Sequence, residues 1–174
     1  MAFLSIKSKI SCMRPATRGF TIIEVMVSIA IVMVLTVVAV PSLSDLVADQ
    51  RVRSTVFDLY GSLILARSEA IKRNANVDIV PTVSGQSNWA SGWQVQTNGA
   101  ALRTQNAVRA VGITGPAASF SYQRDGRIAG GGGAVLVVWN PANSAITARC
   151  IRIDPSGRPN IKLDTNHNPL DGCQ

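Results

Sequence analysis

The 174-residue chain is poor in the residues that most often build catalytic and metal sites. It has one histidine, His167, and three cysteines, Cys12, Cys150 and Cys173, so a dedicated zinc site is not expected. Charged residues make up 16% and hydrophobic residues 47% of the chain, which excludes an intrinsically disordered protein. No catalytic, cofactor-binding or metal-binding residues are predicted, and neither an enzyme nor a small-molecule substrate is expected.

Acidic residues are absent from the first 23 positions, where Lys7, Lys9, Arg14 and Arg18 lie. Without residues 1–19 the chain has 13 basic and 10 acidic residues, a net charge of +3 in place of +7. The basic isoelectric point, near 10.0, therefore comes largely from the N-terminal segment. The length leaves room for one domain of ordinary size with an appendage.

A long uncharged run follows this basic segment. Val25–Val40 contains no charge, and the stretch Phe20–Pro41 spans about 22 residues, or ~33 Å as a helix. A bilayer core is ~30 Å thick, so the stretch is long enough to span it and too long for the apolar part of a signal peptide. Because the basic residues lie upstream, the positive-inside rule places the N-terminus in the cytoplasm and the chain after Pro41 outside. A plain single-pass anchor is the alternative.

Glu24 is the one acidic residue in this apolar stretch. A carboxylate at such a position costs on the order of 2–3 kcal/mol on insertion scales and usually has a partner. No Lys or Arg lies within one helical turn after it. Cleavage between Gly19 and Phe20 would create an α-ammonium four residues before Glu24, and this cation could pair with Glu24 of the same chain or, better, of a neighbour.

The segment Arg18–Glu24, of sequence RGFTIIE, resembles the class III signal of type IV prepilins and type II secretion pseudopilins. The combination of a basic residue and Gly, then Phe, then Glu four places on, then an apolar span ending in Pro, is specific. The resemblance implies cleavage after Gly19 by a prepilin peptidase, N-methylation of Phe20 and a role of Glu24 in subunit assembly. Residues 1–19 are then a leader peptide.

The pattern becomes amphipathic after Pro41, with apolar residues at spacings of three and four. We expect one helix from about Phe20 to about Asn74, ~80 Å long, that is kinked or loosened at Pro41 without ending there. Residues 20–41 form its transmembrane and assembly half, and residues 42–74 the amphipathic half that packs on a head. The apolar stripe of the second half consists of Leu43, Leu46, Val47, Val52, Val56, Leu59, Leu63, Ala66 and Ala70.

Residues 75–174 are predicted to form a head of short strands between turns. Sequential strands without helical crossovers predict an antiparallel sheet. The predicted fold class is therefore α+β, with a long N-terminal helix packed on an antiparallel β head. Trp89, Trp93, Phe120 and Trp139 are expected in the core or on a sheet face rather than on a binding platform. The expected strands are Val77–Val80, Gly92–Thr97, Ala107–Ile113, Ser119–Arg124, Val135–Asn140, Thr147–Asp154 and Asn160–Leu163.

Two further segments narrow the resemblance. Leu65–Asn74, LARSEAIKRN, is similar to the end of the helix in the GspH/FimT/FimU branch, and Ser91–Val95, SGWQV, resembles its next strand. The resemblance implies a minor type IV pilin that primes or caps a pilus (FimU-like), a DNA-binding minor pilin of natural transformation (FimT-like), or a minor pseudopilin of type II secretion (GspH-like). It also implies other pilins as partners and a location in the inner membrane with the head in the periplasm, followed by a pilus or pseudopilus.

Basic residues near the C-terminus make DNA a candidate partner. Exposed side chains such as Arg149, Arg152, Arg158 and Lys162 can hold phosphates, although an ordinary solvated face is the alternative. FimT-type relatives are associated with DNA capture through a Gly-Arg-x-Arg loop. Here Gly157–Asn160, GRPN, matches only its first half, which weakens the DNA hypothesis.

Two cysteines remain after the predicted cleavage, since Cys12 lies in the leader. Cys150 and Cys173 would face an oxidising compartment, which favours their pairing. The bond would stabilise the head by roughly 3 kcal/mol in the chain-entropy model.

His167 is expected to be an exposed loop residue. The run Gly130–Gly133 lacks the Lys-Ser or Lys-Thr of a phosphate-binding loop and is expected to be a connection.

Overall fold

The computed structural model describes residues 19–83, 85, 87–166, 168, 171 and 173, with the backbone alone described at residues 38–41. The predicted leader up to Arg18, including Cys12, lies outside the described residues, as does His167. The chain divides into two compact units, Met1–Val40 and Pro41–Gln174.

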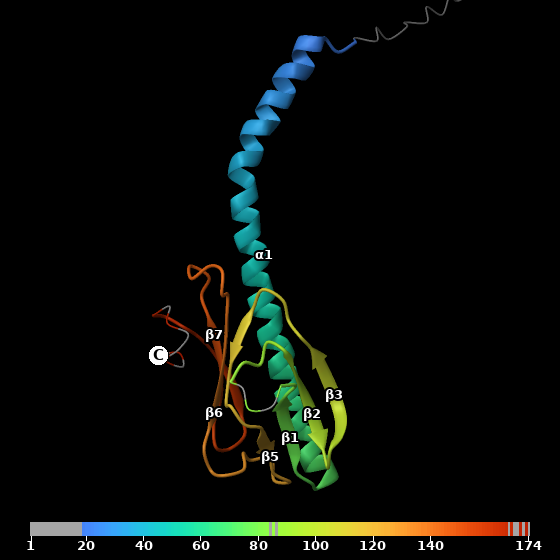
Figure 1. Ribbon diagram of the computed structural model, residues 1–174, viewed down its shortest axis with the longest axis vertical. Helices are drawn as coiled ribbons and strands as arrows, with labels where there is room; N and C mark the ends of the chain where they lie inside the picture. Colours follow the sequence, from blue (N-terminus) through green and yellow to red (C-terminus); the bar gives the residue numbers. More distant parts are fainter. Residues whose placement is uncertain are drawn as a thin grey trace, which may run out of the picture. The chain divides into compact units, whose positions relative to one another are not determined.

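One helix, α1 (Ile22–Arg73), provides residues to both units (Figure 1). The predicted helix is confirmed to within two residues at each end. The backbone N–H of Glu24 donates to Thr21 Oγ1 at 3.3 Å, so Thr21 acts as the N-cap. At the other end Asn74 has a φ of 50°, and the N–H of Ala75 donates to the Ala70 carbonyl at 3.2 Å, which closes the last turn. Pro41 does not end the helix.

In the first unit, α1 exposes apolar side chains on every side. A helix that is hydrophobic all round is normally covered by lipid or by other helices. On length and hydropathy, no single helix of the described residues qualifies as a membrane span, whereas the segments Ile22–Val37 and Ser42–Arg73 of α1 qualify together. The exposed apolar residues are Phe20, Ile22, Ile23, Val25, Met26, Val27, Ile29, Ile31, Val32, Met33, Val34, Leu35 and Val37.

In the second unit, the described strands form two four-stranded sheets. Every pairing is antiparallel, which confirms the predicted α+β fold. The first sheet has the order β3-β2-β1-β5, with β1 (Val77–Pro81), β2 (Gly92–Thr97), β3 (Ala100–Asn106) and β5 (Phe120–Tyr122). The second has the order β4-β6-β7-β8, with β4 (Gly112–Thr114), β6 (Ala134–Trp139), β7 (Arg149–Ile153) and β8 (Pro159–Leu163).

The core of the head joins one face of α1 to both sheets. Trp89 and Trp93 are fully buried in it, and Phe120 packs against it. The indole Nε1 of Trp93 donates to Ser62 Oγ of α1 at 3.0 Å, so two buried polar groups satisfy each other. The core includes Val52, Val56, Leu59, Leu63, Ala66 and Ala70 of α1, Ile79 and Val95 of the first sheet, and Leu136, Ile151 and Ile153 of the second.

The buried part of the apolar stripe is shorter than the sequence predicts. Leu43, Leu46 and Val47 are 60%, 66% and 42% exposed, whereas Val52 is fully buried. The difference arises because the apolar side chains of the two sheets reach α1 only from Val52 onward. The three residues therefore share the periodicity of the core without belonging to it.

The predicted strand Ala107–Ile113 is wrong. The chain forms β3 before this segment, and β4 begins only at Gly112. Asn98 and Gly99 have φ values of 49° and 78°, and they make the two-residue turn of a β2–β3 hairpin. As the edge strand of its sheet, β3 is partly exposed on both faces, so its sequence AALRTQN lacks the alternation by which a half-buried strand is recognised.

Candidate assembly site and basic surface

The predicted processing site lies just before α1. Gly19 and Phe20 precede the helix and are exposed, Phe20 at 79%. A methyl group placed on Gly19 would have no atom within 4 Å among the described residues. The bond after Gly19 thus lies in a non-helical, exposed segment.

Glu24 lies in the first turn of α1, and its main chain is fully bonded. Its N–H donates to Thr21 Oγ1, and its carbonyl accepts from Ser28 Oγ at 2.7 Å. The Thr-x-x-Glu spacing is that of a capping box, in which the Glu carboxylate would also accept from the N–H of the N-cap residue. In the described part of the chain that return bond is absent, and the Glu24 carboxylate has neither a hydrogen bond nor an ion pair.

The other polar side chains of the apolar half are satisfied within the helix. Ser28 Oγ donates to the Glu24 carbonyl and Thr36 Oγ1 to the Met33 carbonyl, at 2.7 and 2.8 Å. A first-turn carboxylate also gains about 0.3–1 kcal/mol from the helix dipole, so Glu24 is tolerated there without a partner. Its charge nevertheless remains available to a cation.

The four basic residues predicted as a group do not form one. Arg149 faces α1, where its Nη2 lies 3.6 Å from Asp49 Oδ1 and its side chain is 17% exposed. Arg152 and Lys162 lie on the opposite face of the second sheet, where Arg152 pairs with Asn160 in register. The prediction that includes Arg149 is therefore corrected, because successive residues of a strand point to opposite faces.

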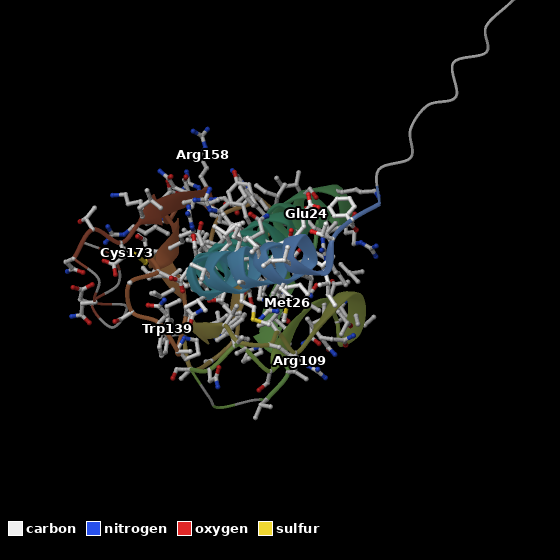
Figure 2. All side chains as sticks on the ribbon, turned by 90° about the horizontal axis from the view of Figure 1, so that it is seen from above. Glu24, Met26, Arg109, Trp139, Arg158 and Cys173 are labelled. Atoms are coloured by element: carbon white, nitrogen blue, oxygen red, sulfur yellow. A yellow bond between two sulfur atoms is a disulfide. The ribbon has the colours of Figure 1, made fainter. Side chains whose placement is uncertain are left out.

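Arg152, Arg158 and Lys162 do come together, around a hollow of about 280 Å³. Figure 2 shows Arg158 directed away from the head. Asp154, in the same hollow, accepts hydrogen bonds from Ser156 Oγ at 2.6 Å and from the N–H of Arg158 at 3.0 Å. These bonds, the hydroxyl's above all, hold the pKa of the Asp154 carboxyl below its ordinary value. The hollow thus combines three cations with one ionised carboxylate.

Cys150 and Cys173 form a disulfide bond, with their Cα atoms 6.0 Å apart. Together with Val137 and Ala148 they make a small apolar cluster separate from the main core. The bond fastens the C-terminal segment to β7.

The sequence analysis missed one group of polar side chains, in the segment between β8 and Cys173. Asp164 is 1% exposed, and Asp171 has a buried carboxylate oxygen. The signal in the sequence is the alternation of Asp and Asn in DTNHNPLD.

Comparisons with known proteins agree with this architecture. Residues 55–157 match the family model of the type II transport protein GspH, and residues 14–40 match the prokaryotic N-terminal methylation motif. No curated protein matches the chain significantly.

Solved structures with the same fold include two crystal forms of the type IV minor pilin FimU from Pseudomonas aeruginosa strain PAO1. Both are 17% identical, with TM-scores of 0.56 and 0.59, and cover 70% and 72% of this chain and 99% and 96% of their own. The minor pseudopilin EpsH from the type 2 secretion system of Vibrio cholerae has a TM-score of 0.52 and 9% identity, over 66% of this chain and 98% of its own. Since the GspH model covers more than half of the chain, the protein belongs to the GspH family of minor pilins and pseudopilins.

Proposed function

We propose that this protein is a minor type IV pilin with a FimU-like role, which primes or caps pilus assembly. The observation that carries the assembly step of the proposal is the Glu24 carboxylate, which has no partner among the described residues. It lies four residues after Phe20, the N-terminus that cleavage after Gly19 would create. The chain enters the inner membrane with its head in the periplasm. A prepilin peptidase removes residues 1–19, and the new N-terminus, Phe20, is methylated.

Assembly then transfers the apolar half of α1 from lipid to a bundle of pilin helices. The exposed apolar side chains between Phe20 and Val37 exchange one apolar environment for another, so the hydrophobic cost of leaving the bilayer is largely offset. In the low-dielectric bundle, Glu24 pairs with the Phe20 ammonium of the adjacent subunit. The head supplies the contacts with other pilins that determine the position of the subunit.

The test is incorporation of Glu24→Ala into filaments. We expect the variant to insert into the membrane normally but to be strongly depleted from sheared pili. Ser28→Ala is the matched control, because its hydroxyl is bonded within the helix and it should assemble normally. Normal recovery of Glu24→Ala in filaments would refute the proposed pairing, and mass spectrometry showing an intact leader on functional protein would refute the processing.

A GspH-like role in a type II secretion pseudopilus would use the same processing and the same Glu24 contact. Cross-linking of the protein in its own cells discriminates the two roles. Minor pilins as cross-linked neighbours would support the proposed role, and pseudopilins as neighbours would replace it.

DNA binding by the head is a second candidate function. The observation that favours it is the meeting of Arg152, Arg158 and Lys162 around one hollow. We expect Arg158→Ala and Arg152→Ala to weaken binding of duplex DNA by the full-length protein at low and moderate salt. Arg109→Ala is the control, since Arg109 is exposed on a different part of the head (Figure 2). No binding by the unsubstituted protein, or equal binding by all variants, would exclude this function.

A further inference from the structure

The segment after β8 carries four oxygen-bearing side chains, Asp164, Asn166, Asn168 and Asp171, in the pattern Asp-x-Asn-x-Asn-x-x-Asp. Asp or Asn at positions one, three and five is the spacing with which Ca²⁺-binding loops wrap their ion. The sixth position is Pro169 rather than Gly, and the last acid comes at the eighth position, so the segment is not an EF-hand. The pattern therefore needs support from the structure.

That support comes from two buried carboxylate oxygens. Asp164 is 1% exposed, and its Oδ2 has no hydrogen-bond partner in the described part of the chain. Asp171 Oδ1 is also a buried atom without a hydrogen-bond partner there. A buried carboxylate is strongly unfavourable unless a positive group or hydrogen-bond donors compensate it.

Both carboxylates lie against the same residue. The backbone N–H of Asn166 donates to Asp164 Oδ1 at 3.3 Å, and Asn166 Nδ2 donates to Asp171 Oδ2. The N–H of Asn168 donates in turn to Asn166 Oδ1 at 2.9 Å, which links the remaining residue of the pattern, its third, to Asn166 as well. Asn166 thus links the two carboxyl groups, and a divalent cation is a ligand that could satisfy the unpartnered oxygen of each.

Side-chain cations of the protein do not neutralise the pair. Among the described residues, no Lys or Arg nitrogen lies within 4.0 Å of either carboxylate. Arg152 and Lys162 line a hollow together with Asp171 but form no ion pair with it. Their positive field lowers the affinity for a metal ion without occupying its place.

The segment is fastened at both ends. The N–H of Asp164 donates to the Ala148 carbonyl at 2.9 Å, and Cys173 is bonded to Cys150. Both attachments are to residues at or just before the start of β7. Because the ends are already fixed, ion binding would order little additional chain.

We propose that this segment binds Ca²⁺ through Asp164, Asn166, Asn168 and Asp171. The described chain contains no group of three or more His, Cys, Asp or Glu side chains that could hold a metal, so the site depends on its two amides as well as on its two acids. Ca²⁺ accepts such neutral oxygen ligands and irregular geometry more readily than Mg²⁺. With only two carboxylates, the dissociation constant is on the order of 10⁻⁴ to 10⁻³ M, as in extracellular modules.

The experiment uses the full-length, disulfide-bonded protein in detergent, freed of metal with a chelator. Calorimetric titration with CaCl₂ should give saturable binding, and CaCl₂ should raise the unfolding temperature of the head more than MgCl₂ at the same concentration. Asp164→Asn and Asp171→Asn should each weaken Ca²⁺ binding by about tenfold or more, because each removes a charged ligand. Asp125→Asn is the matched control, since Asp125 is exposed in a turn elsewhere, and it should bind as the unsubstituted protein does.

A comparison without metal separates ligation from a structural role. In chelator, Asp164→Asn should unfold at the same temperature as the unsubstituted protein or higher, because the substitution removes a buried charge. In CaCl₂ the unsubstituted protein should unfold at the higher temperature of the two. No binding of CaCl₂ in the millimolar range would overturn the proposal. Binding that persists in both Asp→Asn variants, or an Asp164→Asn variant that is less stable under both conditions, would do the same.

Discussion

The two halves of α1 share one helical backbone and carry opposite surfaces. Between Ile22 and Val37 apolar side chains are exposed on every side, whereas from Val52 to Ala70 a single apolar face is buried under the head. The second half is covered by other parts of its own chain, whereas the first half has no such cover among the described residues. Helical propensity therefore serves folding in the second half and, under the proposed function, assembly in the first.

The largest expected effect comes from making the same substitution in each half. Leu63 is fully buried, so Leu63→Ala should lower the free energy of unfolding of the head by about 2–5 kcal/mol. Leu35 is 62% exposed, and Leu35→Ala should leave that free energy within about 0.5 kcal/mol. Chemical denaturation of the full-length protein in detergent measures both. Equal losses from the two variants would contradict the difference in burial between the two halves of α1.

The disulfide bond is expected to stabilise the head as well. Replacing Cys150 and Cys173 by Ser should cost roughly 3 kcal/mol, because the bond restricts the unfolded chain. Cys12→Ser is the matched control and should leave the mature protein unchanged, since Cys12 lies in the predicted leader. Denaturation of each variant measures the effect. An unchanged denaturation midpoint after loss of the bond would contradict the prediction.

A matched pair of serines gives a smaller effect. Ser62→Ala leaves the Trp93 indole N–H buried without an acceptor and should cost about 1–3 kcal/mol. Ser28→Ala removes an exposed hydroxyl that bonds only its own helix, and it should cost less than about 0.5 kcal/mol. Thermal unfolding of the head followed by tryptophan fluorescence measures both. A Ser28→Ala loss as large as that of Ser62→Ala would show that the halves do not differ as described.

The smallest effect at neutral pH concerns Tyr122. Burial raises the pKa of its hydroxyl, and the Arg67 guanidinium of α1 opposes this to a lesser extent. A raised pKa in the folded state means that the stabilisation is complete below the ordinary pKa of about 10 and is lost as the pH rises above it.

Tyr122→Phe should therefore change stability by less than about 1 kcal/mol at pH 7 and make the alkaline decline shallower. Denaturation series between pH 7 and about pH 11 measure this. An unaltered slope in Tyr122→Phe would contradict the assignment.

The sequence predicted the elements whose signals are local. The apolar run, the stripe from Val52 onward and the turn residues between strands are of this kind, and they predicted α1 and most strands. The hairpin turn Asn98-Gly99 was visible, but β3 was not predicted because an edge strand need not alternate. The alternation within β7 already separates the faces of Arg149 and Arg152. The sequence could not show which of these faces packs toward α1, because the contact of Arg149 with Asp49 joins residues far apart in the chain.

Among the candidate sites, too, those with a local sequence signal were predicted and those that depend on tertiary structure were not. Gly19, Phe20 and Glu24 were predicted because their spacing along the chain is the signal. The buried state of Asp164 depends on how the C-terminal segment folds back to β7, which no local pattern specifies.

The contact of Arg149 with Asp49 has a consequence for the protein at high ionic strength. Asp49 also pairs with Arg53 at 2.7 Å, but the Arg53 side chain is 50% exposed and that of Arg149 only 17%. Added salt screens exposed charges more than half-buried ones. At high salt concentration the Arg53–Asp49 ion pair within α1 should therefore weaken first, while the Arg149–Asp49 ion pair between α1 and the second sheet persists.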